Sequence, residues 1–228
     1  KYGLVAIPII DHEDCLVGIV TVDDAMLVLQ DETTEDISIM AGVSPNEDSY
    51  FGTSVFQHAK NRSLWLMLLM LSATVTGEIL GYYENAMAVM PVLITFIPML
   101  MGTGGNCGSQ SSTLVIRGLA VGEIEFKDIF RVIFKEIRIA LIVGLLLSVV
   151  NGIRIYIMYD QNIMLALALG ITMIAVVTMA KCIGCILPLL AKKLGLDPAI
   201  MAAPLITTIL DTCTILVYFN IVTAFFHI

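Results

Sequence analysis

Five long stretches of apolar residues constrain this sequence more than any other feature. Each has roughly the 20 residues that a helix needs to cross the ~30 Å hydrocarbon core of a bilayer. They lie at about residues 64–81, 86–101, 137–158, 163–190 and 199–226. We therefore predict an all-α polytopic membrane protein with five transmembrane helices in each subunit.

The composition agrees with this prediction and excludes other classes of protein. Of the 228 residues, 58% are hydrophobic and 14% are charged, whereas about a quarter of a soluble domain is charged. The net charge of −8 argues against a polyanion as the main partner, so nucleic-acid binding is not expected. Residues 1–59 hold 11 of the 20 acids and a single Lys or Arg, which indicates an acidic head before a nearly neutral membrane body.

The acidic head contains two short strands and a helix. Residues 4–10 and 16–22 are apolar runs separated by a polar turn, which predicts a β-hairpin. Asp23 and Asp24 then begin a helix that continues toward Ile39. A lone hairpin with one helix cannot bury an adequate core. Because the sequence also begins without Met, we interpret it as part of a longer protein.

Lys and Arg flank the apolar stretches unevenly. Nine of them fall on the side of the membrane that carries the head, and Arg154 falls on the other side. Because cytoplasmic loops carry an excess of Lys and Arg, we predict a cytoplasmic N-terminus and, with five spans, a C-terminus outside. An odd number of spans is not a simple inverted duplication, so a homodimer is the economical way to build a central pathway.

Asp211, near the middle of the last apolar stretch, is the first candidate for a functional residue. An ionised carboxylate at mid-bilayer costs about 3 kcal/mol, so it should face a hydrated or paired interior. One interpretation is an ion pair with Lys181, an intramembrane charge at comparable depth. The other is a cation site, in which Thr207 shares a helical face with Asp211. In that case Pro204 removes a backbone hydrogen bond and leaves carbonyls free.

The residue types around Asp211 indicate which cations such a site would take. Oxygen ligands without His or thiolate suit Mg²⁺, Ca²⁺ or Mn²⁺. Mg²⁺ gives up water reluctantly, so a few carboxylates acting through its hydration shell would suffice. The three histidines, His12, His58 and His227, have no metal-ligand spacing, and a zinc site is not expected.

A glycine-rich stretch, residues 102–110, follows the second apolar stretch. Its glycines permit close approach of the backbone, and two amide side chains stand four residues apart. A phosphate-binding loop would need a Lys after the glycines, and the stretch has none. We interpret it as a polar packing element beside a pore, with a plain loop as the alternative. The candidate residues are Gly104, Gly105, Asn106, Gly108 and Gln110.

The acids of the head form the third candidate site. They are followed, on the turn before the last apolar stretch, by Asp197. Like charges at this density repel one another unless cations screen them. From the residues alone a solvated acidic face is the favoured interpretation, and an ion-sensing switch is the alternative. The cluster comprises Asp23, Asp24, Asp31, Glu32, Glu35 and Asp36.

Several short motifs together resemble the MgtE family of magnesium channels. In the membrane body they are Gly102-Thr-Gly-Gly-Asn-x-Gly-x-Gln110, Leu196-Asp-Pro-Ala199 and Pro204-x-x-x-Thr-x-x-Asp211. In the head, residues 16–24 are similar to the closing part of a CBS domain, and Thr34-Glu-Asp-Ile37 is similar to the family's connecting plug helix. The resemblance covers essentially the whole chain.

The resemblance implies a domain organisation and roles for individual residues. Residues 1–27 would be the end of a CBS domain, 28–59 the acidic plug helix with its linker, and 60–228 a five-span ion-conducting domain. The subunits would form a homodimer in the cell membrane. Asp211 would hold hydrated Mg²⁺ together with its dimer mate, and Thr207 would contribute its main-chain carbonyl. At the cytoplasmic mouth, Mg²⁺ would bridge Asp197 to Glu35 or Asp36, and Asp24 would belong to a regulatory site.

The function implied is a magnesium-selective channel, not an enzyme. Influx would be driven by the membrane potential, and cytoplasmic Mg²⁺ bound to the acidic head would close the pore. The alternatives are an ion-coupled secondary transporter of divalent cations, in which intramembrane Asp211 and Lys181 relay protons, and a non-conducting Mg²⁺ sensor.

Overall fold

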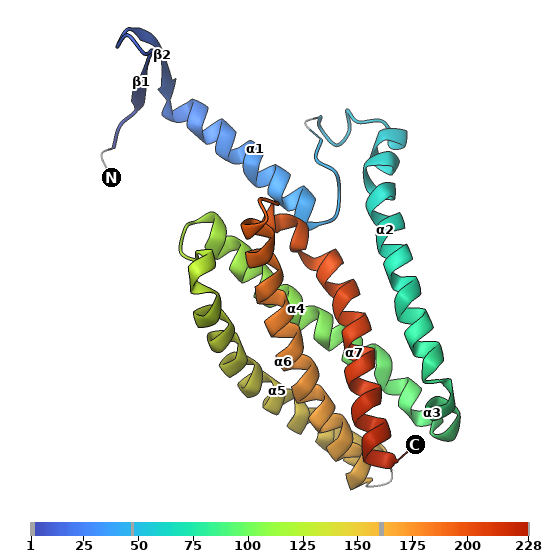
Figure 1. Cartoon of the computed structure of the whole chain (residues 1–228). Helices are drawn as coiled ribbons and strands as arrows, with labels where there is room; N and C mark the ends of the chain where they lie inside the picture. The colour runs from blue at the N-terminus through green and yellow to red at the C-terminus, as the bar shows by residue number, and fades with distance from the viewer. Residues whose placement is uncertain (1–2, 47, 160–161, 228) are drawn as a thin grey trace.

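The computed structural model describes residues 3–46, 48–159 and 162–227 and is mostly helical (Figure 1). The head comprises strands β1 (Ala6–Ile10) and β2 (Leu16–Thr21) and helix α1 (Val22–Met40). The membrane body begins with α2 (Val55–Tyr82) and the short α3 (Glu84–Val89). Its remaining elements are η1 (Pro91–Phe96), α4 (Ile97–Ala120), η2 (Phe126–Asp128), α5 (Ile129–Met158), α6 (Ile163–Lys193), η3 (Pro198–Met201) and α7 (Ala203–Phe226), where η denotes a 3₁₀ helix.

Helices α4 to α7 form the packed bundle of the body. Helix α6 contacts α4, α5 and α7, and α4 also packs along α7. Because α6 is apolar over nearly its whole circumference, it can be buried on several sides. The core around it is fully buried at Leu100, Val177, Leu210 and Phe219. This arrangement brings three helices to one crossing, where α4, α6 and α7 meet.

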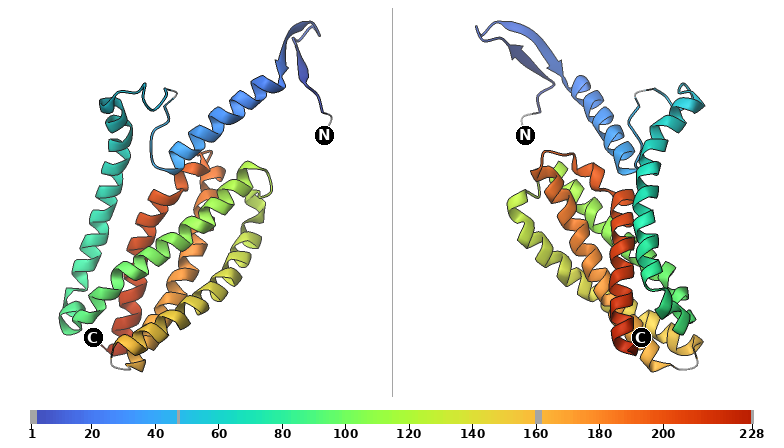
Figure 2. Two further views of the ribbon diagram at one scale, coloured as in Figure 1. Left: turned by 180° about the vertical axis from the view of Figure 1, so that it is seen from behind. Right: turned by 45° about the vertical axis from the view of Figure 1, so that its right-hand side comes forward.

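Helix α2 stands at the edge of the bundle (Figure 2). It packs along α7, where the hydroxyls of Thr76 and Thr212 hydrogen-bond to each other at 2.6 Å. Thr76 is its one buried residue, while Leu64, Leu68 and Leu71 are exposed. An apolar helix exposed to this extent is consistent with contact with lipid or with another membrane helix.

The head extends away from the bundle. Strands β1 and β2 pair antiparallel, and a capping box between Thr21 and Asp24 begins α1. No residue of β1, β2 or α1 is buried. The far end of α1 reaches η3 at the start of α7 (Figures 1 and 2).

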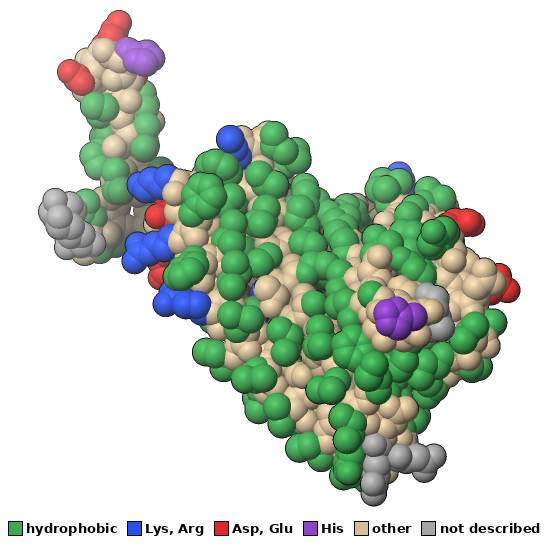
Figure 3. Space-filling view, turned by 60° about the horizontal axis from the view of Figure 1, so that its bottom comes forward, with side chains coloured by type: hydrophobic (Ala, Val, Ile, Leu, Met, Phe, Trp, Pro, Cys, Tyr) green, Lys and Arg blue, Asp and Glu red, His purple; other side chains and the backbone are tan. Residues whose placement is uncertain are grey.

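Three helical segments of the described chain are long and apolar enough to cross a membrane: Val55–Tyr82, Ile163–Lys193 and Pro198–Phe226. They correspond to the first, fourth and fifth predicted spans. The surface of the bundle is broadly apolar, and most of the visible Lys and Arg gather at the edge nearest the head (Figure 3). The chain is therefore a largely helical membrane protein, and a total of five spans remains a prediction.

The second predicted span is wrong in its boundaries. Residues 86–101 do not form one helix: α3 ends at Val89, η1 follows, and α4 begins at Ile97 and continues to Ala120. Pro91 and Pro98 each lie in the first turn of a helical element, where proline is tolerated because its missing N–H has no helical partner there. The prolines therefore mark the starts of new elements instead of lying inside one span.

Candidate functional site

The candidate ion site lies on α7, which has a proline in its first turn. The chain enters α7 from η3 through Ala202, which is extended, with φ −87° and ψ −166°. Pro204 lies in the first turn of α7, where a backbone N–H has no helical partner in any case. The prediction that Pro204 removes a hydrogen bond inside a continuous helix is therefore wrong, although Pro198–Phe226 as a whole is long and apolar enough to cross a membrane.

Two threonine hydroxyls donate hydrogen bonds to the backbone in the first turn of α7. The Oγ1 atoms of Thr207 and Thr208 donate to the carbonyl of Pro204 at 3.0 and 2.9 Å. That carbonyl therefore has two side-chain donors within the chain. The carbonyl that the missing N–H of Pro204 would leave without a helical donor is that of Ile200, four residues earlier, so free carbonyls beside Asp211 stay a prediction. Thr207 lies one helical turn before Asp211 on the same side of α7, so these two predicted residues are neighbours.

The Asp211 side chain is partly buried within the single chain. None of the three ion pairs among the described residues involves it. Lys181, the cation that could have neutralised it, lies 3.7 Å from Glu136 of α5 instead. The structure therefore does not support an Asp211–Lys181 ion pair.

Glu136, Lys181 and Ser111 form a buried polar cluster that joins three helices. Ser111 of α4 donates from Oγ to Glu136 Oε2 at 2.7 Å, and Lys181 Nζ of α6 donates to the same Oγ at 3.3 Å. Glu136 is 8% exposed and Lys181 5%. Glu136 was not among the predicted residues because it stands in a basic segment that was expected to be cytoplasmic. The signal that could have found it was Lys181, an intramembrane cation that needs a buried acid.

The glycine-rich stretch lies inside α4 and forms its contact face with α6 and α7. The stretch is helical, so the alternative of a plain loop is wrong. A Cβ on Gly105 would lie 3.1 Å from Thr207 Cγ2, and one on Gly104 would lie 2.8 Å from Thr214 Oγ1. A Cβ on Gly108 would clash with Leu210. Small residues therefore let α4 approach the helix that carries Asp211.

Asn106 and Gln110 lie away from this contact face. Both are exposed in the single chain, one turn apart on α4, whereas Gly104 and Gly108 are buried. The structure thus divides the predicted residues between two faces of one helix. Their position beside a pore stays a prediction, since it depends on what covers the exposed face.

A single copy of the chain does not assemble a complete metal site from its acids. Within residues 3–46, 48–159 and 162–227, no three His, Cys, Asp or Glu side chains come together as metal ligands. Mg²⁺ prefers six oxygen ligands and commonly keeps several waters. A cation at Asp211 would therefore need water, backbone oxygens or a second copy for its remaining ligands.

The acids of the head and of the body meet where α1 contacts η3. Asp36 and Asp197 line one groove of about 210 Å³, which Lys192 also lines. Asp197 Oδ1 accepts from the Ala199 N–H at 2.8 Å, and Lys192 Nζ donates to the Leu119 carbonyl at 3.1 Å. Burial raises the pKa of Asp36, and the negative charge of Asp197 raises it further. Two of the predicted cytoplasmic residues are therefore brought together.

The other two predicted acids of α1 lie elsewhere. Glu35 is exposed and lines a separate pocket of about 520 Å³ with Asp31 and Asn46. Asp24 accepts from the Thr21 hydroxyl at 2.6 Å and from its N–H at 2.9 Å, and these hydrogen bonds lower the pKa of Asp24. In this structure Asp24 therefore caps α1, and a regulatory role for it stays a prediction.

Ionisation of the Asp36 carboxyl at the α1–η3 contact is expected to destabilise the folded chain. Replacing Asp36 with Asn should remove this loss of stability. Because folding raises the pKa of Asp36, the folded chain binds the proton more tightly, and stability falls as pH rises from the ordinary Asp value through the raised one. Without divalent cations, we expect Asp36→Asn to raise the melting temperature at neutral pH by a few degrees at most, with little change in acid. Thermal unfolding in detergent between about pH 4 and 7 measures this, with exposed Asp31→Asn as the control. If the melting temperatures of Asp36→Asn and Asp31→Asn depend on pH in the same way, the prediction is contradicted.

Comparison with known proteins assigns the family. A protein-family model described as "MgtE: Divalent cation transporter" matches residues 97–221, which is more than half of the chain. The chain belongs to the MgtE family. The match spans α4 to α7 and so includes both the glycine face and Asp211.

Three proteins named "Magnesium transporter MgtE" are similar to the chain over nearly its whole length. That of Thermus thermophilus is 36% identical over 220 residues, covering 96% of this chain and 48% of that protein. That of Bacillus subtilis is 37% identical over 227 residues (100% and 50%), and that of Enterococcus faecalis 35% over 227 residues (98% and 49%). This MgtE-family chain thus spans about half the length of these curated relatives.

Proposed function

We propose that this chain conducts Mg²⁺ across the cell membrane as a homodimeric channel of five-span subunits. The observation that carries the proposal is Asp211, a carboxylate on an apolar helix with no cationic partner among the described residues. An unpaired carboxylate at this depth is stabilised if it faces a hydrated cation. The relatives named magnesium transporter support Mg²⁺ as that cation.

In this proposal, two copies of α7 present Asp211 to one ion. Two carboxylates acting through the hydration shell suit Mg²⁺, which dehydrates reluctantly. Thr207 contributes oxygen one turn away, and the glycine face of α4 supports α7 by close packing against it. Asn106 and Gln110, exposed on α4, line the same pathway. The membrane potential then pulls a divalent ion inward with about 4.6 kcal/mol per 100 mV, twice the single-charge value.

The contact between α1 and η3 supplies the proposed gate. With the N-terminus in the cytoplasm, Asp36 and Asp197 face one groove there, and cytoplasmic Mg²⁺ bound between them holds α1 over the mouth. When Mg²⁺ falls, repulsion between the two acids releases α1 and the pore opens. Asp24 and Glu35 contribute to further Mg²⁺ sites, and residues 1–27 act as the end of a CBS domain.

Ion-coupled transport is the second candidate function. The observation that favours it is the buried Glu136–Lys181–Ser111 cluster, a titratable group within the bundle of the kind found in proton relays. A channel needs only the electrical gradient and the concentration gradient. A coupled transporter also responds to a proton or sodium gradient.

Flux measurements in liposomes separate the two functions. The chain is reconstituted, an inside-negative K⁺ diffusion potential is imposed, and Mg²⁺ entry is followed with an internal fluorescent indicator. We expect entry to increase with the potential and to be indifferent to an imposed pH or sodium gradient. Entry that requires either gradient at zero potential would support coupled transport, and the absence of entry would support a sensor.

A further inference from the structure

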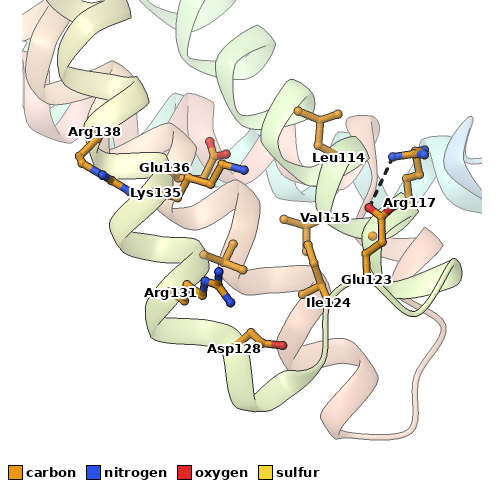
Figure 4. A pocket seen from close by; sticks show the side chains of 12 residues that line it. Leu114, Val115, Arg117, Glu123, Ile124, Asp128, Arg131, Lys135, Glu136 and Arg138 are labelled. Atoms are coloured by element: carbon orange, nitrogen blue, oxygen red, sulfur yellow. Dashed lines mark ion pairs between the residues drawn. The ribbon is translucent and has the colours of Figure 1, made fainter.

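A groove between α4 and α5 remains outside the proposed ion pathway. It has a volume of about 690 Å³ and is walled by the last turns of α4, the connection to η2 and the first turns of α5. Four cationic side chains surround it, contributed by both helices (Figure 4). They are Arg117, Arg131, Lys135 and Arg138.

Each carboxylate that lines the groove already has a partner. Glu123 lies 3.8 Å from Arg117. Asp128 Oδ2 accepts from the Glu125 N–H at 3.1 Å, and Glu136 points to the buried cluster with Ser111 and Lys181. Glu123 and Glu136 are therefore paired with Arg117 and Lys181, and Asp128, which keeps its charge, forms no ion pair with the cations of α5 among the described residues.

The cations on α5 are left with unsatisfied charge. None of the ion pairs in the described part of the chain involves Arg131, Lys135 or Arg138. Arg138 stacks over the Phe134 ring, 4.9 Å from its centroid, while Arg131 and Lys135 are exposed. The groove is thus a basic site in which the exposed side chains of Arg131 and Lys135 can contact an anion. Guanidinium and ammonium groups in this setting favour phosphate oxygens.

The position of the groove along α5 indicates where that anion comes from. Residues 139–153 of α5 contain no charged side chain, so Arg138 is the last cation before a largely apolar, uncharged segment. This transition is typical of the boundary between hydrocarbon and headgroups. On the same turns of α5, Phe130 and Phe134 are 82% and 62% exposed, which leaves apolar surface beside the cations.

We propose that this groove binds the headgroup of an anionic phospholipid from the adjoining leaflet. Arg131 and Lys135 contact its phosphate, and its acyl chains run along Phe130 and Phe134. Basic pockets between membrane helices at the headgroup level are suited to such lipids. The lipid would join α4, which carries the glycine face, to α5, which carries Glu136.

Native mass spectrometry of the intact chain in detergent tests this site directly. Phosphatidylglycerol is titrated in, with phosphatidylcholine as the neutral competitor, and the dissociation constant of the first bound lipid is measured. Because both cations contact the lipid phosphate in this proposal, we expect Arg131→Gln/Lys135→Gln to weaken phosphatidylglycerol binding by about tenfold or more. Binding of phosphatidylcholine should be unchanged.

Matched variants decide the outcome. Lys60→Gln/Arg62→Gln removes two exposed cations near the start of α2 and should leave phosphatidylglycerol binding intact. Arg131→Lys/Lys135→Arg keeps both positive charges in the groove and should also retain phosphatidylglycerol binding. All four positions are exposed, so every variant is expected to fold. The melting temperature of each variant checks this. If Lys60→Gln/Arg62→Gln weakens phosphatidylglycerol binding as much as Arg131→Gln/Lys135→Gln does, the proposal is overturned. Displacement of the lipid by millimolar inorganic phosphate would also overturn it, in favour of a site for a soluble anion.

Discussion

Replacing Lys181 with Met is expected to destabilise the folded chain by about 3–5 kcal/mol. The change removes the cation 3.7 Å from Glu136 and leaves a carboxylate that is 8% exposed with the Ser111 hydroxyl as its remaining donor. A buried charge without compensation is costly, whereas a neutral pair of similar volume is not. Equilibrium unfolding of the purified protein in mixed detergent micelles measures the loss.

Two further variants test whether burial of charge is the cause. Lys181→Met/Glu136→Gln should recover at least half of the lost stability, because a glutamine can still accept from Ser111 and carries no charge. Lys127→Met breaks the shorter ion pair with Glu125, at 2.8 Å, but both side chains are more than half exposed, so no measurable change is expected. Failure of the double variant to recover stability would show that Lys181 acts through packing and not through its charge.

Replacing Gly184 with Ala is expected to have the second-largest effect, a loss of about 3 kcal/mol. Gly184 of α6 faces Gly108 of α4 at the crossing of the two helices, and a Cβ there would clash with the Gly108 carbonyl oxygen. This oxygen belongs to the backbone of a buried helix, so the clash is relieved only if the two helices separate. Overpacking of this kind typically costs 1–3 kcal/mol and occasionally more.

The matched control is Gly152→Ala in α5. A Cβ on Gly152 would have no neighbouring atom within 4 Å, and alanine has the higher helix propensity. The control should therefore be neutral or slightly stabilising when unfolding is measured under the same conditions. If Gly184→Ala behaves like Gly152→Ala, then α4 and α6 are not held at the distance that the structure gives.

The long apolar helices could be predicted from the sequence because their signal is local. Runs of about 20 apolar residues identify α2, α6 and α7 without reference to the rest of the chain. The break at Ala202 and the helical state of residues 102–110 could not be predicted in the same way. Glycine weakens an isolated helix, and this stretch is helical because α6 and α7 pack directly on its glycines.

The candidate site was predictable where a residue is anomalous by itself. Asp211 is conspicuous as an acid in an apolar run, and its neighbour Thr207 follows from helical spacing. The partner of Lys181 was not predictable, because Glu136 is 45 residues distant in sequence and hidden among Arg and Lys. The choice between Glu35 and Asp36 likewise depends on the rotation of α1 against η3, which places Asp36 toward Asp197.

The most direct test of the central claim is Mg²⁺ entry into liposomes that contain the chain or its Asp211→Ala variant, at a fixed inside-negative potential. Removing the Asp211 carboxylate should lower Mg²⁺ entry relative to other cations by at least about tenfold, since each 1.4 kcal/mol of lost interaction is a factor of 10. Glu78→Ala removes an exposed acid of α2 and should leave entry intact. Undiminished and still selective entry through Asp211→Ala would contradict the account and move the ion site to residues 102–110 or to Glu78.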